Sequence, residues 1–315
     1  MSAEVLTVTE QLSREEWLKA RQKGIGGSDA AAVAGLNRWK SPFQVFMEKV
    51  DKAPQEEIRN QEAMYWGNVM EDVVAKEFTE RTGMKVRKRN AILKHPEYGW
   101  MLANVDRLIV GKKEGLECKT ANEYAKQDWE GEEIPTAYLL QCQHYMAVTG
   151  YEVWWIAVLV GGNKFIYKRI ERDQELINNL IEIEMEFWEQ HVLKDEPPEI
   201  DGTEASESFL SSMYPESEPG HEVELPDAMD SYFDAIEVIK TEMKDLETRK
   251  KEYENKVKQM IGEAEKAYSS RHIVSWKSIQ TNRFDSKSFK KDHPDLFKKY
   301  AKPSSYRRFT IKEAN

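Results

Sequence analysis

The sequence predicts an α/β protein with a helical extension in its carboxyl-terminal third. Segments with helical and with strand periodicity alternate between residues 13 and 193, as they do in a sheet covered by helices. Five of the 11 prolines fall between 197 and 226, in a stretch rich in Ser and Glu that we interpret as a linker or crossing segment. A heptad pattern follows over about 227–268.

The composition is that of a chain with a sizeable core. Hydrophobic residues make up 40% of the 315 residues and aromatic residues 10%. No apolar run approaches the ~20 residues that span a bilayer, so we expect no membrane partner. The first residues are polar and acidic, unlike a signal or transit peptide. We therefore expect a cytoplasmic protein.

Capping residues mark where the first helices begin. Ser13 and Glu16 form a capping-box pattern, and Pro42 follows Ser41 in the first helical position, which favours proline. The glycine-rich loop 24–28 delivers Ser28 to the start of another helix. The expected elements of this part are helices over 13–23, 28–35, from 42 onward, and 61–82; strands over 84–93, 100–110 and 115–120; a helix over 136–148; strands over 151–160 and 164–170; and a helix over 173–193.

The extension is expected to contain one long helix and a basic tail. The heptad pattern of this helix predicts a coiled coil or a helical hairpin, in which the apolar stripe forms part of a core or a contact between subunits. Strands are expected over 271–279 and 305–312. The heptad positions are Ile236, Ile239, Met243, Leu246, Lys250, Tyr253, Val257, Met260 and Ala264.

Charge is distributed unevenly along the chain. The formal net charge is −10, which by itself argues against a nucleic-acid partner. Residues 201–270, however, carry 8 basic against 18 acidic residues, and residues 271–315 carry 12 against 4. A nucleic-acid-binding protein needs a local basic surface, which the tail provides. Its lysines and arginines either hold phosphates or form the solvated rim of a small packed subdomain.

The two cysteines, Cys118 and Cys142, exclude several classes of site. Two thiols cannot form a disulfide framework or the four-thiolate site that zinc or an iron–sulfur cluster requires. Both lie in apolar surroundings, so we expect buried, reduced thiols.

The strongest chemical pattern is a pair of acids and a lysine on two expected strands. Glu117 and Lys119 share one face of a strand because side chains alternate, while Leu116 and Cys118 point to the other face. On the preceding strand we expect Asp106 to share a face with Leu102, Asn104 and Leu108, and pairing of the two strands would bring Asp106 beside Glu117 and Lys119. Carboxylates suit Mg²⁺, and a neighbouring lysine can position water or stabilise a transition state at phosphorus. The alternative is a solvated hairpin with ordinary surface charges.

Two helices offer further polar groups. Glu71 borders the apolar face of the helix over 61–82, so it either assists the site or forms an ion pair. Gln141 and Tyr145 share a helix face at i, i+4, and both could reach a metal-bound water or DNA. A simple polar edge is the alternative for this second pair.

Arg21 and Ser28 flank the glycine-rich loop. A helix N-terminus offers free backbone N–H groups to an anion, and arginine adds a planar fork that fits a phosphate. The alternative is a tight connector in which Ser28 is a plain helix cap.

Taken together, these segments resemble the YqaJ-type phage recombinase family, the lambda-exonuclease-like branch of the PD-(D/E)xK nucleases. They occur in the family's order and cover about residues 14–170. The proline-like position of the superfamily pattern is Asn104-Val105 here. The resembling segments are 21–30, Ser41-Pro42, 65–71, 103–106, 115–121 and 141–150.

The resemblance implies a restriction-endonuclease-like core, with a central mixed sheet flanked by helices. Together with the proline-rich stretch and the heptad pattern, it leads us to divide the chain into a nuclease core over residues 1–196, a linker or crossing segment over 197–226, and the long helix with the basic tail over 227–315. It also implies roles for individual residues: Asp106 and Glu117 as ligands of Mg²⁺ or Mn²⁺, with the Cys118 backbone carbonyl as a third; Lys119 as the catalytic lysine; Glu71 and Gln141 as assisting residues; and Arg21 and Ser28 at a DNA 5′-phosphate.

The implied activity is 5′-to-3′ exonuclease digestion of linear double-stranded DNA in phage-type homologous recombination. Partners would be a RecT-like single-strand annealing protein and further copies of the chain, for example in a trimer, within the bacterial host cytoplasm. Two alternatives remain open at this point: a structure-selective endonuclease acting on branched or nicked DNA, and a non-catalytic DNA-binding or assembly protein on a nuclease scaffold.

Overall fold

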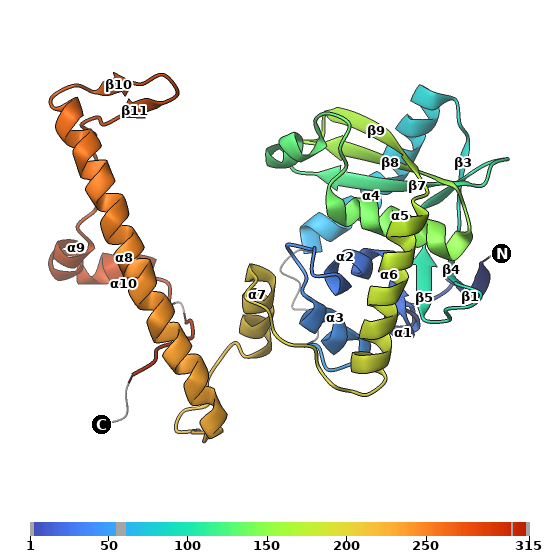
Figure 1. The fold of residues 1–315 in the computed structure, drawn as a ribbon, viewed down its shortest axis with the longest axis horizontal. Coiled ribbons are helices and arrows are strands. Elements are labelled where there is room, and N and C mark those ends of the chain that lie inside the picture. Colours follow the sequence, from blue (N-terminus) through green and yellow to red (C-terminus); the bar gives the residue numbers. More distant parts are fainter. Residues whose placement is uncertain (1–2, 55–60, 304, 313–315) are drawn as a thin grey trace. The chain divides into compact units, whose positions relative to one another are not determined.

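The computed structural model describes residues 3–54, 61–303 and 305–312, which form two compact units, Met1–Tyr214 and Pro215–Asn315 (Figure 1). The strands of the first unit are β1 Glu4–Val8, β2 Ile25–Gly26, β3 Val86–Lys88, β4 Ala91–Lys94, β5 Met101–Asn104, β6 Arg107–Ile109, β7 Glu114–Ala121, β8 Val153–Val160 and β9 Lys164–Glu171. Its α-helices are α1 Arg14–Gln22, α2 Gly27–Val33, α3 Pro42–Lys49, α4 Gln61–Thr82, α5 Thr136–Thr149, α6 Gln174–Glu186 and α7 Glu204–Met213. Short 3₁₀ and π segments lie over Glu123–Trp129 and Phe187–Val192.

The strands form two sheets. One has the order β1-β4-β5-β2 and the other β3-β6-β7-β8-β9, in which β7 and β8 run parallel and their other neighbours antiparallel. This confirms the expected α/β core with a mixed sheet flanked by helices.

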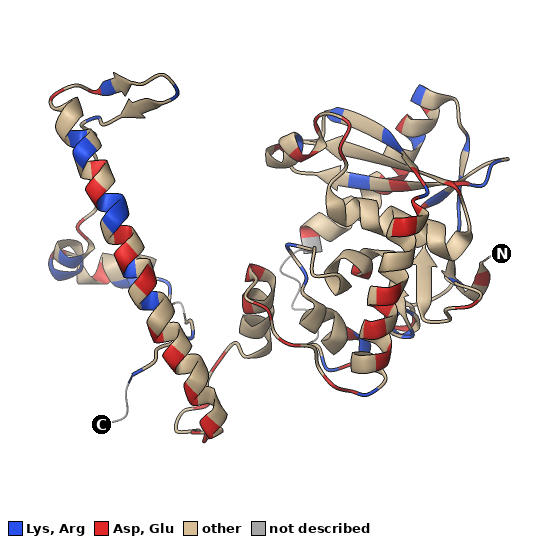
Figure 2. Ribbon diagram, viewed as in Figure 1, with Lys and Arg blue, Asp and Glu red and all other residues tan. Residues whose placement is uncertain are grey.

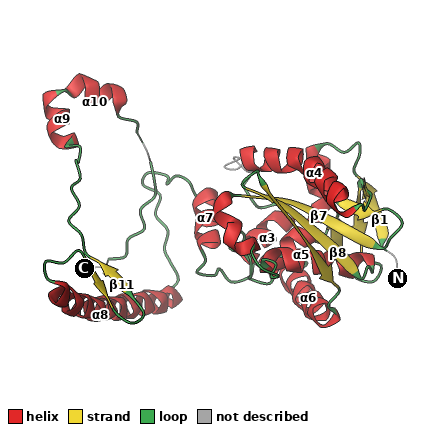
Figure 3. Cartoon of the chain, turned by 90° about the horizontal axis from the view of Figure 1, so that it is seen from above, coloured by secondary structure: helices red, strands yellow, loops and turns green. Residues whose placement is uncertain are grey.

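Helices α4 and α5 cover opposite faces of the five-stranded sheet (Figure 3). Trp154, Ile156 and Val158 of β8 pack in one cluster with Cys142 and Met146 of α5. The residues between them face α4, whose packing side chains are Val74, Ala75 and Phe78. Leu116 and Cys118 belong to the α4 side, so Glu117 and Lys119 lie on the α5 side, as alternation along β7 predicts.

Two expected strands are each divided between the two sheets. The strand expected over 84–93 is β3 and β4, and the strand expected over 100–110 is β5 and β6. Residues 105 and 106, where the chain passes from one sheet to the other, are called the crossing below. Asp106 lies there and does not share a strand face with Leu102, Asn104 and Leu108. The expectation was wrong because apolar alternation continues through the break, whereas the hydrogen-bonding partners change.

Helix α7 belongs to the first unit. Its Phe209 packs edge-to-face on Phe43 of α3, with ring centroids 6.0 Å apart. The segment from 197 to 226 thus contains an ordered helix as well as extended chain.

The second unit contains the long helix α8 (Asp230–Ile261), a hairpin of β10 (Lys266–Tyr268) and β11 (Ile273–Ser275), and the short helices α9 (Ser286–Asp292) and α10 (Pro294–Tyr300). The helix ends earlier than expected because Gly262 adopts a φ of +57°, which leaves the helical region. Residues 305–312, expected as a strand, are in neither a helix nor a strand. Within the described part of the chain, no helix has the length and hydropathy needed to cross a membrane.

Candidate active site

The crossing between the sheets brings Asp106 to β7. The Cys118 amide donates a hydrogen bond of 2.8 Å to Asp106 Oδ2, and this bond lies beyond Leu116, where the β6–β7 pairing ends. Asp106 therefore takes the place of a strand partner at the edge of β7. Strand pairing predicted that Asp106 would lie beside Glu117 and Lys119, but not that the Asp106 side chain, in place of its backbone, would bond to β7.

Next to Asp106, the buried Glu117 forms an ion pair with the partly exposed Lys119. Lys119 Nζ lies 2.6 Å from Glu117 Oε1, and Glu117 is only 2% exposed. Gln141 Nε2 of α5 donates to the same carboxylate oxygen at 2.6 Å. The other oxygen, Glu117 Oε2, is buried and has no hydrogen-bond partner among the described residues. A buried carboxylate oxygen without a partner is costly, which suits a group that awaits a ligand.

Asp106 is in an environment that opposes its negative charge. Burial, followed by repulsion from Glu117, raises the pKa of Asp106 from 3.8 to about 7. Burial alone would lower the pKa of Lys119, but attraction to Glu117 and Asp106 overcomes it and raises that pKa, so Lys119 stays protonated. The site holds more negative charge than one lysine balances comfortably, which is the electrostatic setting of a cation site.

Glu71 reaches the crossing from α4. Its carboxylate accepts a hydrogen bond from Arg107 Nη1, which also donates to the Asp106 carbonyl at 2.7 Å. Asp72 accepts from the other guanidinium nitrogen at 2.6 Å. Burial and the nearby Asp106 carboxylate raise the pKa of Glu71. The structure thus gives Glu71 the ion-pair partner that the sequence left open, at a position adjoining Asp106.

Gln141 and Tyr145 form a hydrogen bond with each other, and Tyr145 also bonds to the residue at the end of β5. Gln141 Nε2 lies 2.9 Å from Tyr145 Oη, and the tyrosine hydroxyl donates to the Asn104 carbonyl at 3.1 Å. Both side chains are at most 5% exposed. Their polar atoms therefore act within the protein, fixing Glu117 on one side and the end of β5 on the other.

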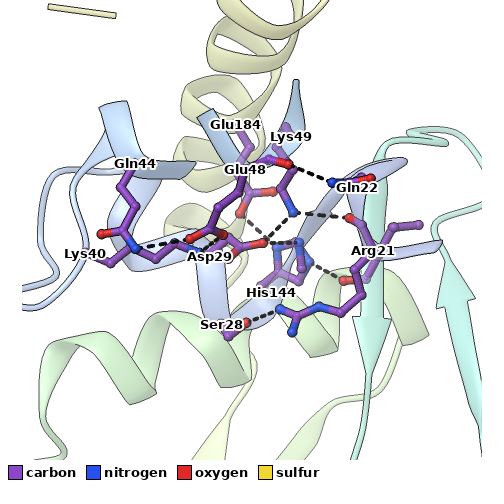
Figure 4. A network of polar contacts seen from close by, with 12 residues as sticks. Arg21, Gln22, Ser28, Asp29, Lys40, Gln44, Glu48, Lys49, His144 and Glu184 are labelled. Carbon is purple, nitrogen blue, oxygen red and sulfur yellow. Dashed lines mark hydrogen bonds and ion pairs between the residues drawn. The ribbon is translucent and has the colours of Figure 1, made fainter. Parts of the chain in front are cut away.

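Arg21 and Ser28 meet beside a buried charge cluster (Figure 4). Arg21 Nη2 donates to Ser28 Oγ at 2.7 Å, and the guanidinium lies 4.7 Å from the centre of the Trp17 ring. No carboxylate forms an ion pair with Arg21 in the ranges that the structure describes. The guanidinium thus keeps donors available for an anion at the start of α2.

The cluster is built around Asp29, which is 1% exposed. Its carboxylate accepts from Lys40 at 2.8 Å, from Lys49 at 2.7 Å and from the Gly26 amide at 3.3 Å. Lys49 also donates to the Arg21 carbonyl at 3.2 Å. The pKa of Asp29 is lowered well below its usual range because these cations outweigh the effect of burial. Asp29 thereby links α1, α2 and α3 near the start of α2, where Ser28 lies.

A fully buried histidine–glutamate pair lies next to this cluster (Figure 4). His144 Nδ1 is 2.8 Å from Glu184 Oε1, and His144 Nε2 is 2.9 Å from the Leu102 carbonyl oxygen. Since a carbonyl only accepts, Nε2 carries a proton, and the Nδ1–carboxylate contact holds another. Glu184 raises the pKa of His144 despite burial. The pair fastens α5 and α6 to β5.

The donor set suits a hard divalent cation with few protein ligands. Within residues 3–54, 61–303 and 305–312, no group of three or more His, Cys, Asp or Glu side chains is arranged to hold a metal. Mg²⁺ commonly uses one or two carboxylates, with water and substrate phosphates completing its shell. Asp106 and the unpartnered Glu117 Oε2 are such a pair.

Residues 16–152 match the YqaJ-like viral recombinase domain. Over 315 residues the chain is 45% identical to the uncharacterized protein YqaJ of Bacillus subtilis (strain 168), a match that covers 99% of this chain and 98% of the relative. The chain belongs to the YqaJ-like viral recombinase family. The domain match includes all eight positions that the resemblance assigned to the site, at 21, 28, 71, 106, 117, 118, 119 and 141.

Two solved structures are similar to part of this chain. An alkaline exonuclease from Laribacter hongkongensis is 20% identical and covers 58% of this chain and 94% of its own, with a TM-score of 0.49. A phage related exonuclease from Haemophilus somnus 129PT is 14% identical and covers 55% and 96%, with a TM-score of 0.41.

Sequence reasoning missed the buried charges behind the site. Asp29 lies in the short, otherwise small and apolar helix GSDAAAV, where a lone acid signals a buried partner. His144 and Glu184 carried no such signal, because a polar residue on an amphipathic helix usually faces solvent.

Proposed function

We propose that this recombinase-family protein is a divalent-metal-dependent deoxyribonuclease that digests linear double-stranded DNA from its 5′ ends during phage-type homologous recombination. The observation that carries the proposal is the meeting of Asp106, Glu117 and Lys119 at one edge of β7, with Glu117 Oε2 left buried and unpartnered among the described residues. Two acids and an amine in reach of one point are the minimum for hydrolysing a phosphodiester with a metal ion.

Asp106, Glu117 and the Cys118 carbonyl would hold Mg²⁺ or Mn²⁺. The N–H and C=O of a strand residue point to the same edge, and the Cys118 N–H points to Asp106, so its carbonyl faces the same edge. When bound, the ion would polarise the scissile phosphate and make an attacking water more acidic. The proposal of these ligands is supported by the donor chemistry and by the repulsion between the two acids.

Lys119 would donate to the phosphate oxygens or orient the attacking water. Its high pKa favours the protonated form, which stabilises negative charge at phosphorus and is a poor proton acceptor. Gln141 would orient Glu117, and Glu71 would hold the Asp106 backbone through Arg107. These two are positioning residues in this arrangement.

Arg21 and Ser28 would bind the terminal 5′-phosphate of the DNA. The guanidinium supplies a planar fork, and α2 contributes the partial positive charge of its N-terminus. Recognition of a phosphorylated terminus would confine cleavage to linear DNA and set its direction. The digested duplex leaves a single strand, and a RecT-like annealing protein is the partner that fits this product, with assembly of several copies around the duplex.

The test compares linear duplexes carrying a 5′-phosphate or a 5′-hydroxyl, and covalently closed circles, each with and without Mg²⁺. We expect Mg²⁺-dependent release of mononucleotides from labelled 5′ ends, faster with the phosphate, and intact circles. Efficient cutting of closed circles would refute the exonuclease assignment and favour an endonuclease. Full Mg²⁺-dependent activity in a Glu117→Ala variant would refute the assigned site.

A further inference from the structure

Helix α8 carries an apolar stripe that its own unit leaves open. The helix is 32 residues long, and its hydrophobic side chains recur at alternating steps of three and four residues. Six of them are between 42% and 90% exposed: Ile239, Met243, Leu246, Tyr253, Val257 and Met260. A stripe of this spacing is the seam of a two-helix coiled coil, so α8 is shaped for another helix.

Charge is graded along α8. Residues 230–245 contain five acids and two bases, and residues 246–261 contain three acids and five bases. Figure 2 shows Lys and Arg gathering toward the β10–β11 end and Asp and Glu toward the other end. A helix with opposite charge at its two ends is complementary to itself only when the second copy runs in the opposite direction.

We infer that α8 pairs with α8 of a second copy of this chain in antiparallel orientation. In an antiparallel coiled coil of two helices, the first heptad position of one helix faces the fourth heptad position of the other. In α8 the first positions are 236, 243, 250 and 257, and the fourth positions are 239, 246, 253 and 260. Setting Ile239 opposite Val257 of the second copy then places Ile236 opposite Met260 and Met243 opposite Tyr253. All apolar heptad positions from 236 to 260 meet an apolar residue except Leu246, which faces Lys250.

The residues that flank this seam decide between the two orientations. In the antiparallel register Glu242 lies beside Lys256 of the second copy, and Lys240 beside its Glu254, each pair occurring twice. Arg249 and Glu247 meet their own copies once each, at the midpoint.

A parallel pairing in register is poorer. It would place Glu242 against Glu247 twice, and would stack Lys250 on Lys250 within the seam. Its favourable contact is Arg249 with Glu254. The antiparallel arrangement therefore has more opposite-charge contacts and no buried lysine pair.

Disulfide trapping in the full chain tests the orientation. In an Ile239→Cys, Val257→Cys variant the antiparallel pairing joins position 239 of one copy to 257 of the other. The same two positions within one helix are ~27 Å apart, too far for an internal bond. The native thiols of Cys118 and Cys142 are buried. We expect covalent dimers under mild oxidation, reversed by a reductant.

Two matched variants make the result decisive. Ile239→Cys alone should stay monomeric on a non-reducing gel, since its two copies would lie ~27 Å apart along the seam. Val238→Cys with Val257→Cys should cross-link at least tenfold less, because Val238 is exposed but lies off the stripe. Cross-linking of Ile239→Cys alone, or none in the 239/257 variant, would overturn the proposal.

A charge reversal gives an independent readout by sedimentation velocity. Glu242→Lys should weaken self-association through α8 at least tenfold, because it faces Lys256 in the antiparallel pair, and Glu242→Lys with Lys256→Glu should restore it. In a parallel pair the single change would strengthen association instead, by facing Glu247. Neither experiment measures nuclease activity, so failure here leaves the proposed function untouched, and the reverse also holds.

Discussion

Replacing Asp106 by Asn should abolish nuclease activity and, in the absence of divalent ions, make the protein more stable. The asparagine side chain would keep an oxygen that accepts the Cys118 amide, so the crossing between the sheets stays fastened. What disappears is a negative charge that burial and Glu117 both oppose. The variant would thus lose a proposed metal ligand, and its free energy of unfolding would be larger than that of the wild type.

The size of the gain follows from the pKa. The folded pKa of Asp106, about 7, lies above its ordinary value of 3.8, so the folded state keeps a proton that the unfolded state releases. The contribution of Asp106 to the stability of the wild type therefore falls as pH rises from about 4 to about 7 and is level above that. At ~1.4 kcal/mol per pKa unit the loss is about 4 kcal/mol, and about 2–4 kcal/mol allows for the partial exposure of Asp106.

The assay is urea unfolding with a chelator at several pH values, followed by tryptophan fluorescence. Eight of the nine tryptophans precede Pro215, so the signal reports chiefly on the first unit. The advantage of Asp106→Asn should grow from pH 4 to pH 7 and then stay constant. Mg²⁺ should stabilise the wild type and not the variant. An Asn variant less stable than the wild type at pH 8 without metal would refute the reasoning.

Three further outcomes follow from the same geometry. Lys119→Met should reduce nuclease activity by ~10²–10⁴-fold and keep the stabilisation by Mg²⁺. Its control, Lys126→Met, removes an exposed ion pair and should change neither the activity nor the stabilisation. Equal activity of the two variants would contradict the role of Lys119. Asp29→Asn should lower the free energy of unfolding in urea by about 3–5 kcal/mol, because it leaves two largely buried lysines without a full counter-charge. Asp195→Asn, on the exposed pair with Lys52, should lower it by under ~1 kcal/mol. Similar losses in the two variants would show that the Asp29 cluster is not tightly coupled. Arg21→Ala should raise KM for 5′-phosphorylated ends about tenfold and leave 5′-hydroxyl ends unchanged, and a parallel rise for both ends would exclude a phosphate-specific role.

Periodicity alone predicted much of the fold. Amphipathic helices and alternating strands are recognisable because each buries one face, and α4, α5 and β7 to β9 lie where their patterns placed them. That Glu117 and Lys119 share one face of β7 followed from the same alternation. The family resemblance then told which of many polar residues to consider together.

What the sequence did not reveal depends on contacts between distant segments. Nothing in the run Met101–Val110 shows that its hydrogen-bond partners change at Asp106 from one sheet to the other. Asp29, with Lys40 and Lys49, is likewise a meeting of three elements that only packing brings together. The end of α8 was misplaced because a single glycine, at 262, outweighs a pattern that continues past it.

The crossing at Val105 and Asp106 has a consequence for how this protein can change during evolution. Helix α2 with Ser28 follows β2 of the smaller sheet, while Glu117 lies on β7 of the larger one, and residues 105 and 106 join the two sheets. An inserted residue at the crossing would shift the side chains near the smaller sheet, such as Ser28, relative to those on the larger sheet, such as Glu117. The exposed turn over 111–113 can lengthen without such a shift. Length variation among descendants of this chain should therefore accumulate at the turn and be purged from the crossing.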